Sequence, residues 1–104
     1  MKAILFILTV AISVFANDTK PSYAIQWNHW KPLAEKGDAE AQFSLGFFYI
    51  EGMGTTRDIN KGTDLYIKSA NKGFILAQKS LISMYCDNEY NQSNKEKCKY
   101  WKAK

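Results

Sequence analysis

The stretch GDAEAQFSLGFFYIEGMGTTRDINKGTDLYIKSANKG, residues 37–73, decides how this chain folds. Apolar residues recur in its first half at positions 41, 45, 48 and 49, the spacing of one helix face. Asp38 is placed to cap that helix at its start, and two turn glycines follow it. Asp58 can cap a second helix, which Gly73 closes with a left-handed residue. The stretch therefore predicts a helical hairpin.

The hairpin recurs along the chain with a period of 36 residues. From residue 25 onward, 10 of the 44 residue pairs separated by 36 positions are identical, where chance gives about two or three. They include Ala34 with Ala70, Ala41 with Ala77, Gln42 with Gln78, Leu45 with Leu81, and Tyr49 with Tyr85. A period of about 34 to 40 residues is typical of solenoids made of paired helices.

The remaining segments fit the same plan. Helices are predicted over 24–36, where Pro32 is expected to disturb the helix, over 74–85 and over 95–102, with a polar turn at 87–94. No segment alternates apolar and polar residues, so strands are not expected. The fold class is thus all-α, a short α/α solenoid of antiparallel helix pairs.

The first sixteen residues have the layout of a secretory signal peptide. A positive start at Lys2 precedes an apolar run that ends at Val14-Phe15-Ala16, with small residues suited to cleavage after Ala16. An uncleaved membrane anchor is the alternative, but the run is short for about 30 Å of hydrocarbon. We expect residues 17–104 to form one domain in the periplasm or outside the cell, without stable membrane insertion.

The motif Ala41-x-x-x-Leu45-Gly46-x-x-Tyr49-x-x-Gly52-x-Gly54 resembles the Sel1-like repeat, a relative of the tetratricopeptide repeat. The resemblance continues through Asp58, Lys61, Tyr66, Ala70 and Gly73. It is nearly complete over the full unit, 37–73, and partial over a preceding half unit, 25–36, and a degenerate unit, 74–104. It implies a small exported bacterial member of that family.

Two departures from the repeat have structural consequences. Gly62 stands where the family usually has alanine. In the degenerate unit, Asn88 and Tyr90 replace the two turn glycines, so we expect the last loop, around 87–95, to take a different path. Within the full unit, the small residues Ala41 and Gly46 should let the helices approach closely.

Cys86 and Cys98 are the only cysteines. Behind a signal peptide, an even cysteine number favours a disulfide. In the repeat alignment the two positions face each other across the last helical hairpin. We therefore predict a Cys86–Cys98 bond that strengthens an array with fewer repeats than solenoids usually need.

No residue pattern indicates catalysis, a cofactor or a metal. His29 is the only histidine and has no nucleophile signature beside it. The formal net charge of +4 is modest, and the lysines at 95, 97, 99, 102 and 104 suit a solvated helix face better than a nucleic-acid site. An acidic partner or a membrane surface is the alternative for this lysine-rich segment. We predict a non-enzymatic protein whose partner is another protein.

The resemblance places the binding surface on the first helix of each unit. The partner-binding positions are then expected to be Glu40, Phe43, Phe47, Ile50, Leu76, Lys79 and Ser83. Phe43 and Phe47 differ between units and are free to recognise a partner, unless the N-terminal segment covers them with Trp27 or Trp30.

The predicted function is an interaction module, an adaptor or scaffold in the bacterial envelope. Short exported members of the family suggest an alternative, a periplasmic immunity protein that neutralises a toxic effector such as a phospholipase. A host-directed secreted factor is a third option. Hydrolysis of β-lactams, proposed for cysteine-rich members, is the weakest.

Overall fold

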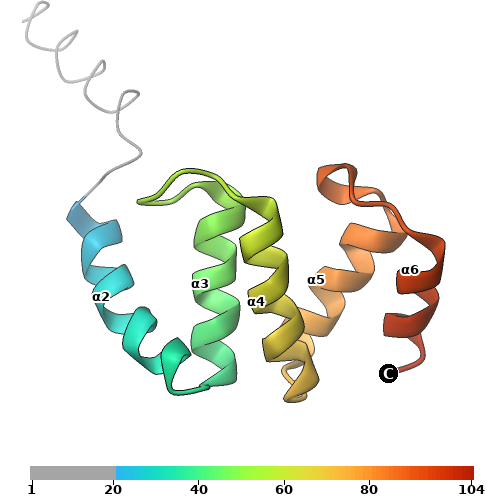
Figure 1. Ribbon diagram of the computed structural model, residues 1–104, viewed down its shortest axis with the longest axis horizontal. Coiled ribbons are helices and arrows are strands. Elements are labelled where there is room, and N and C mark those ends of the chain that lie inside the picture. The colour runs from blue at the N-terminus through green and yellow to red at the C-terminus, as the bar shows by residue number, and fades with distance from the viewer. Residues whose placement is uncertain (1–20) are drawn as a thin grey trace, which may run out of the picture.

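A computed structural model describes residues 21–104, so the predicted signal peptide lies outside the described residues. Within this range the chain is helical and has no strand. Its elements are α2 (Pro21–Glu35), α3 (Ala39–Glu51), α4 (Ile59–Asn71), α5 (Ile75–Cys86), the short 3-10 helix η1 (Glu89–Asn91) and α6 (Lys95–Lys102). Figure 1 shows the helices side by side in chain order, each running against its neighbour. The predicted all-α array of antiparallel helix pairs is confirmed.

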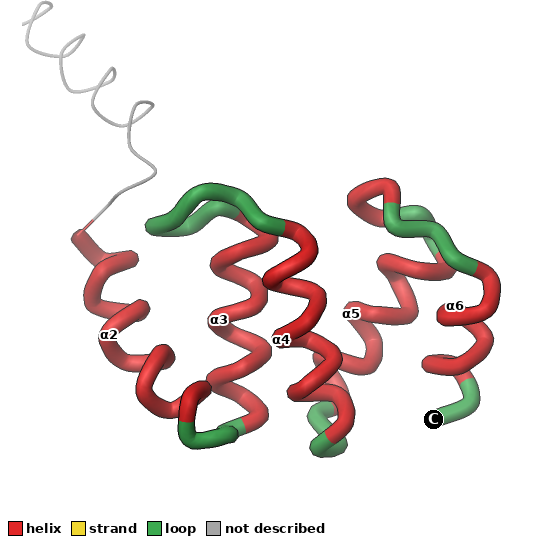
Figure 2. Tube along the Cα trace, in the orientation of Figure 1, coloured by secondary structure: helices red, strands yellow, loops and turns green. Residues whose placement is uncertain are grey.

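The loops alternate between the two ends of this array (Figure 2). The loop after α3 and the loop that holds η1 lie at one end, and the tight turns around 37 and 73 lie at the other. The most extensive helix pairing is α3 with α4. Pro32 lies inside α2, and the helix continues to Glu35, one residue before the predicted end at 36.

The 36-residue repeat is explained by contacts that occur twice. The Gln42 side chain donates to the Ala34 carbonyl at 3.4 Å, and Gln78 donates to that of Ala70 at 3.1 Å. Each glutamine therefore reaches back to the end of the preceding helix and gives a further donor to a carbonyl that also accepts from the turn glycine, Gly37 or Gly73.

A second recurring contact involves an aromatic ring. The Lys61 ammonium lies 5.1 Å from the ring centre of Tyr49, and that of Lys97 lies 5.3 Å from the ring centre of Tyr85. In both units the lysine belongs to the second helix and the tyrosine to the first. The identities found by sliding the sequence thus correspond to cation–π contacts that join the two helices of each unit.

The tight turns that join the units are closed in the same way. Gly37 and Gly73 have φ of 95° and 88°. The Gly37 and Asp38 amides donate to the carbonyls of Ala34 and Leu33, and the amides at 73 and 74 make the equivalent bonds in the next unit. This is the Schellman arrangement, which confirms the left-handed closure predicted at Gly73.

The hydrophobic core has two parts. The smaller part lies between α2 and α3 and contains Ala34, Ala41 and Leu45. The larger part joins α3 to α6 and contains Ile50, Tyr66, Ala70, Ala77, Leu81, Met84, Tyr85 and Trp101. Trp101 is 5% exposed and anchors α6. The five lysines of 95–104 are exposed, as expected for a solvated helix face.

Small residues set the close approach of α3 and α4. A Cβ atom at Gly46 would lie 2.8 Å from the Gly62 carbonyl oxygen, and one at Gly62 would lie 2.6 Å from the Gly46 carbonyl oxygen. Both distances are shorter than real Cβ contacts. The departure at Gly62 therefore fits this chain, because an alanine methyl there would also collide with Ile50.

Candidate functional site

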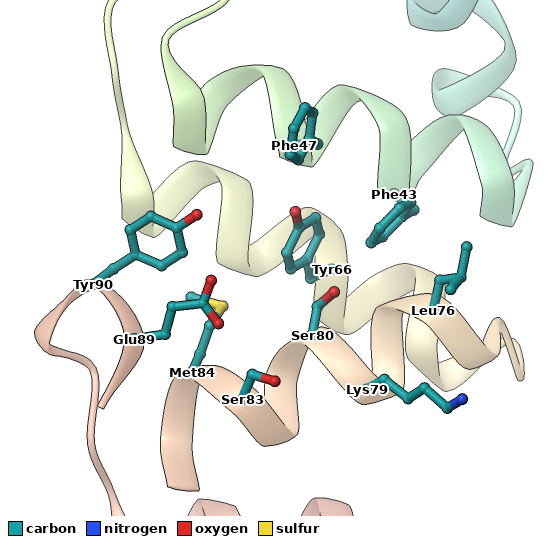
Figure 3. Close-up of a pocket in the computed structure, with 10 residues that line it drawn as sticks. All are labelled: Phe43, Phe47, Tyr66, Leu76, Lys79, Ser80, Ser83, Met84, Glu89 and Tyr90. Carbon is teal, nitrogen blue, oxygen red and sulfur yellow. The ribbon is translucent and has the colours of Figure 1, made fainter. Parts of the chain in front are cut away.

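A groove of about 340 Å³ lies between α3, α5 and η1. Its lining residues come from four elements: Phe43, Phe47, Tyr66, Leu76, Lys79, Ser80, Ser83, Met84, Glu89 and Tyr90. Figure 3 shows the phenylalanines of α3 facing the side chains of α5, with Glu89 and Tyr90 at one end. The groove unites five of the seven residues predicted to contact a partner, namely Phe43, Phe47, Leu76, Lys79 and Ser83.

Phe43 and Phe47 form the α3 wall and differ in burial. Phe43 is partly buried, and its ring lies 4.9 Å from Tyr66 and 5.4 Å from Phe74. Phe47 is 40% exposed. Phe43 thus packs against Tyr66 of its own unit and Phe74 of the next, and the idea that it is free of the fold is wrong. Phe47 remains open to a partner.

In the part of the chain that the structure describes, Trp27 and Trp30 do not cover these rings. The Trp27 ring lies 5.9 Å from Phe48 and 5.1 Å from Tyr49, and its Nε1 donates to the Met53 carbonyl at 2.8 Å. Trp30 packs with the small core between α2 and α3. Both tryptophans are therefore on the α2 side of α3, away from the groove.

Leu76, Lys79, Ser80 and Ser83 form the α5 wall. Leu76 is 56% exposed, a large fraction for a leucine in a small domain. Tyr66 and Met84 lie beneath, only 4% and 1% exposed, and form the floor. The groove therefore has a rigid apolar floor from the core and two exposed apolar side chains, Phe47 and Leu76, at its rim.

The remaining end of the groove is formed by η1, which the partner-site prediction missed. The Tyr90 hydroxyl donates to the Glu51 carboxylate, and the Arg57 guanidinium lies 5.4 Å from the Tyr90 ring centre. The hydrogen bond to Glu51, with burial, raises the pKa of Tyr90 to about 12. Burial raises the pKa of Tyr66, and the nearby Tyr90, Glu51 and Glu89 raise it further. The only sequence signal for this end was the loss of the turn glycines.

Two predicted partner contacts do not line the groove. Glu40 is exposed at the start of α3 but lies outside the lining. Ile50 is 1% exposed, so its prediction as a surface contact is wrong. α3 is covered on two sides, by α2 and α4, and Ile50 fills the space above Gly62, which has no side chain.

Cys86 and Cys98 form the predicted disulfide, with their Cα atoms 5.0 Å apart. The bond joins the end of α5 to α6 and closes the segment that contains η1. Glu89 and Tyr90 therefore sit on a loop that is covalently fixed at its base.

The described residues show no constellation suited to catalysis. The expectation that the sequence holds no catalytic pattern needs one correction: residues 69–72 match the Ser-x-x-Lys spacing of β-lactam hydrolases. However, Ser69 is 0% exposed and its hydroxyl donates to the Ala39 carbonyl at 2.6 Å, while Lys72 donates to the Gly37 carbonyl. His29 lies against Trp30, with ring centres 4.6 Å apart. In residues 21–104 no cluster of His, Cys, Asp and Glu is suited to a metal ion.

A second hollow of about 340 Å³ lies over α2, α3 and α4. Its lining mixes apolar residues with charges of both signs, including Lys31, Glu35, Lys61 and Asp64.

None of the helices in residues 21–104 combines the length and the apolar character needed to cross a membrane.

Comparison with known proteins gives two relatives. The chain is 42% identical over 67 residues to a sel1-like repeat-containing protein of Acanthamoeba polyphaga mimivirus, an alignment covering 64% of this chain and 12% of that protein. It is 33% identical over 76 residues to chitin synthase regulatory factor 3 of Schizosaccharomyces pombe, covering 73% of this chain and 8% of that protein. No family model and no solved structure matches the chain.

The chain thus spans about a tenth of the length of these relatives. The described residues form antiparallel helix pairs. The similarity and the fold together support a Sel1-like repeat family and a protein-interaction repeat module for this chain.

Proposed function

We propose that this protein is an exported, non-catalytic interaction module, a small bacterial Sel1-like repeat scaffold or adaptor that binds another protein through the groove between α3, α5 and η1. One observation carries the proposal. Phe47 and Leu76, 40% and 56% exposed, belong to different units and meet at the same groove, although neither is needed to close a helix pair. Exposed apolar side chains gathered around a hollow are typical of protein-binding sites.

Export rests on two features. The sequence of residues 1–16 resembles a cleavable signal peptide. The Cys86–Cys98 disulfide suits a protein that folds in an oxidising compartment such as the periplasm or the extracellular medium. The fission-yeast relative is named as a regulatory factor, and regulation of another protein fits an interaction module.

The proposal is tested by affinity capture from the envelope fraction with three forms of the protein. The unchanged protein and an Ile25→Ser variant, which alters an exposed side chain on α2, are expected to capture the same partner. A Phe47→Ser/Leu76→Ser variant is expected to lose it, and titration with the purified partner should show at least a tenfold loss of affinity for two apolar contacts.

Equal capture by all three forms would rule out the groove as the binding site. Recovery of a toxin as the groove-dependent partner would narrow the function to immunity. Circular dichroism of each variant confirms that the helices remain formed.

A further inference from the structure

We propose that the groove takes a partner segment that presents a bulky apolar side chain next to a lysine or arginine. The apolar side chain lies between Phe47 and Leu76, and the cation lies at the Glu89 end. This inference rests on the proposed function and specifies the chemistry of the partner.

The size of the groove indicates how much of a partner it takes. The groove holds about 340 Å³ and is open to solvent on one side. It therefore accommodates two or three side chains of a partner segment.

The apolar part of the groove lies away from η1. Phe43, Phe47 and Leu76 surround it, and Figure 3 shows Phe43 and Leu76 at the end opposite Glu89 and Tyr90. An aromatic or leucine side chain placed here would cover the exposed surface of Phe47 and Leu76. Burial of that surface provides the main attraction, at about 25 cal/mol for each Å².

The opposite end is acidic. The Glu89 carboxylate points into the groove in Figure 3, and Glu51 lies at the same end, bound by the Tyr90 hydroxyl. Arg57 is the cation near this end, but it lies over the Tyr90 ring and donates to the Ile50 carbonyl at 2.9 Å. Two carboxylates against one guanidinium leave a net negative charge where the groove is open.

This charge contrasts with the rest of the molecule. The chain has a formal net charge of +4, and the other charged side chain in the lining, Lys79, extends away from the groove centre at the far end. A partner cation is therefore attracted to Glu89 and repelled from the Lys79 end. The groove thus fixes the direction of the segment as well as its composition.

The experiment is selection of random twelve-residue peptides, displayed on phage, against the oxidised protein. We expect enrichment of peptides in which an aromatic residue or leucine stands within a few positions of a lysine or arginine. Fluorescence polarisation with the selected peptides should show that Glu89→Gln weakens binding about three- to fivefold, the effect of one partly exposed charge pair. Glu96→Gln removes an exposed carboxylate on α6, changes the net charge by the same amount as Glu89→Gln, and should leave affinity unchanged.

Phe47→Ser, with Leu76→Ser as a second variant, shows whether the peptides occupy the groove. Loss of binding in these variants, with unaltered unfolding in urea, locates the peptides there. Peptides that bind the groove but lack a basic residue, or ignore Glu89→Gln, would overturn this inference and leave the proposed function standing. Failure to select any peptide, or binding that survives both serine variants, would overturn both.

Discussion

The α3–α4 hairpin and the α5–α6 hairpin are related by the 36-residue repeat and differ most in the loop that joins their helices. In the first hairpin, Gly52 and Gly54 adopt φ of 69° and 72°. In the second, Asn88 and Tyr90 occupy the equivalent positions, and both have a φ of 57°. The left-handed backbone is therefore kept after the glycines are lost, although η1 gives the second loop a different course, as its sequence predicted.

The comparison shows where the second hairpin gains its stability. A bulky side chain in the left-handed region costs of order 1 kcal/mol or more. At this loop the cost is offset by the disulfide at its base and by the contacts of Tyr90 with Glu51 and Arg57. This loop conformation places the side chains of Glu89 and Tyr90 at one end of the groove. The first loop has glycines at these positions and is contacted by Trp27, whose Nε1 donates to the Met53 carbonyl, and none of its residues lines the groove.

Removal of the disulfide should have the largest effect. The Cys86→Ser/Cys98→Ser variant is expected to lose about 3 kcal/mol of unfolding free energy, because the unfolded chain is no longer restricted by a closed loop between residues 12 positions apart. Hydrogen exchange should show the loss of protection concentrated in η1 and α6, with α3 and α4 much less affected. A loss below about 1 kcal/mol, or one spread evenly over both hairpins, would contradict the role given to the bond.

Substitutions at the equivalent loop positions should change the stability of the two hairpins by different amounts. Gly54→Ala is expected to destabilise the protein by about 1–3 kcal/mol, since its φ is 72° and its Cβ would lie 2.8 Å from Trp27 Nε1. Tyr90→Gly removes the backbone cost and also the side-chain contacts, so stability should change by less than about 1 kcal/mol.

Urea unfolding of both variants measures this difference. Tyr90→Gly should also lower the affinity of the protein for the peptides selected against the groove. A correctly folded Gly54→Ala variant should bind these peptides with unchanged affinity. Equal destabilisation by the two substitutions would show that the second loop does not carry the strain assigned to it.

The smallest expected effect concerns alkaline pH. The pKa of Tyr90 is about 12 in the folded chain against an ordinary value of 10.0. A raised pKa means that the folded state holds the proton more tightly, so the contribution is complete below pH 10 and is lost as pH rises from 10 to 12. Between pH 10 and 12, the unfolding free energy of Tyr90→Phe should fall less steeply than that of the unchanged protein. Tyr100→Phe, which changes an exposed tyrosine on α6, serves as the control. Identical slopes in the two variants would contradict the Tyr90–Glu51 interaction.

The repeat pattern predicted many of the residues that line the groove. The errors in this prediction have clear physical causes. The predicted partner contacts Phe47, Leu76, Lys79 and Ser83 line one groove, because the first helix of each unit presents them at regular spacing. Ile50 was misassigned because a helix wheel does not show that α3 is covered on two sides. Tyr90 and Glu89 were missed because their position depends on how a loop folds back toward the preceding unit.

The sequence by itself determined the helices, their caps, the period of the array and the pairing of the two cysteines. These depend on local spacing and on residues that recur 36 positions apart, such as Gln42 with Gln78 and Tyr49 with Tyr85. Only the tertiary structure decided which aromatic rings are exposed and that η1 closes the groove with an acidic end. Those properties arise where side chains from four elements meet, and the burial of each one depends on neighbours distant in the chain.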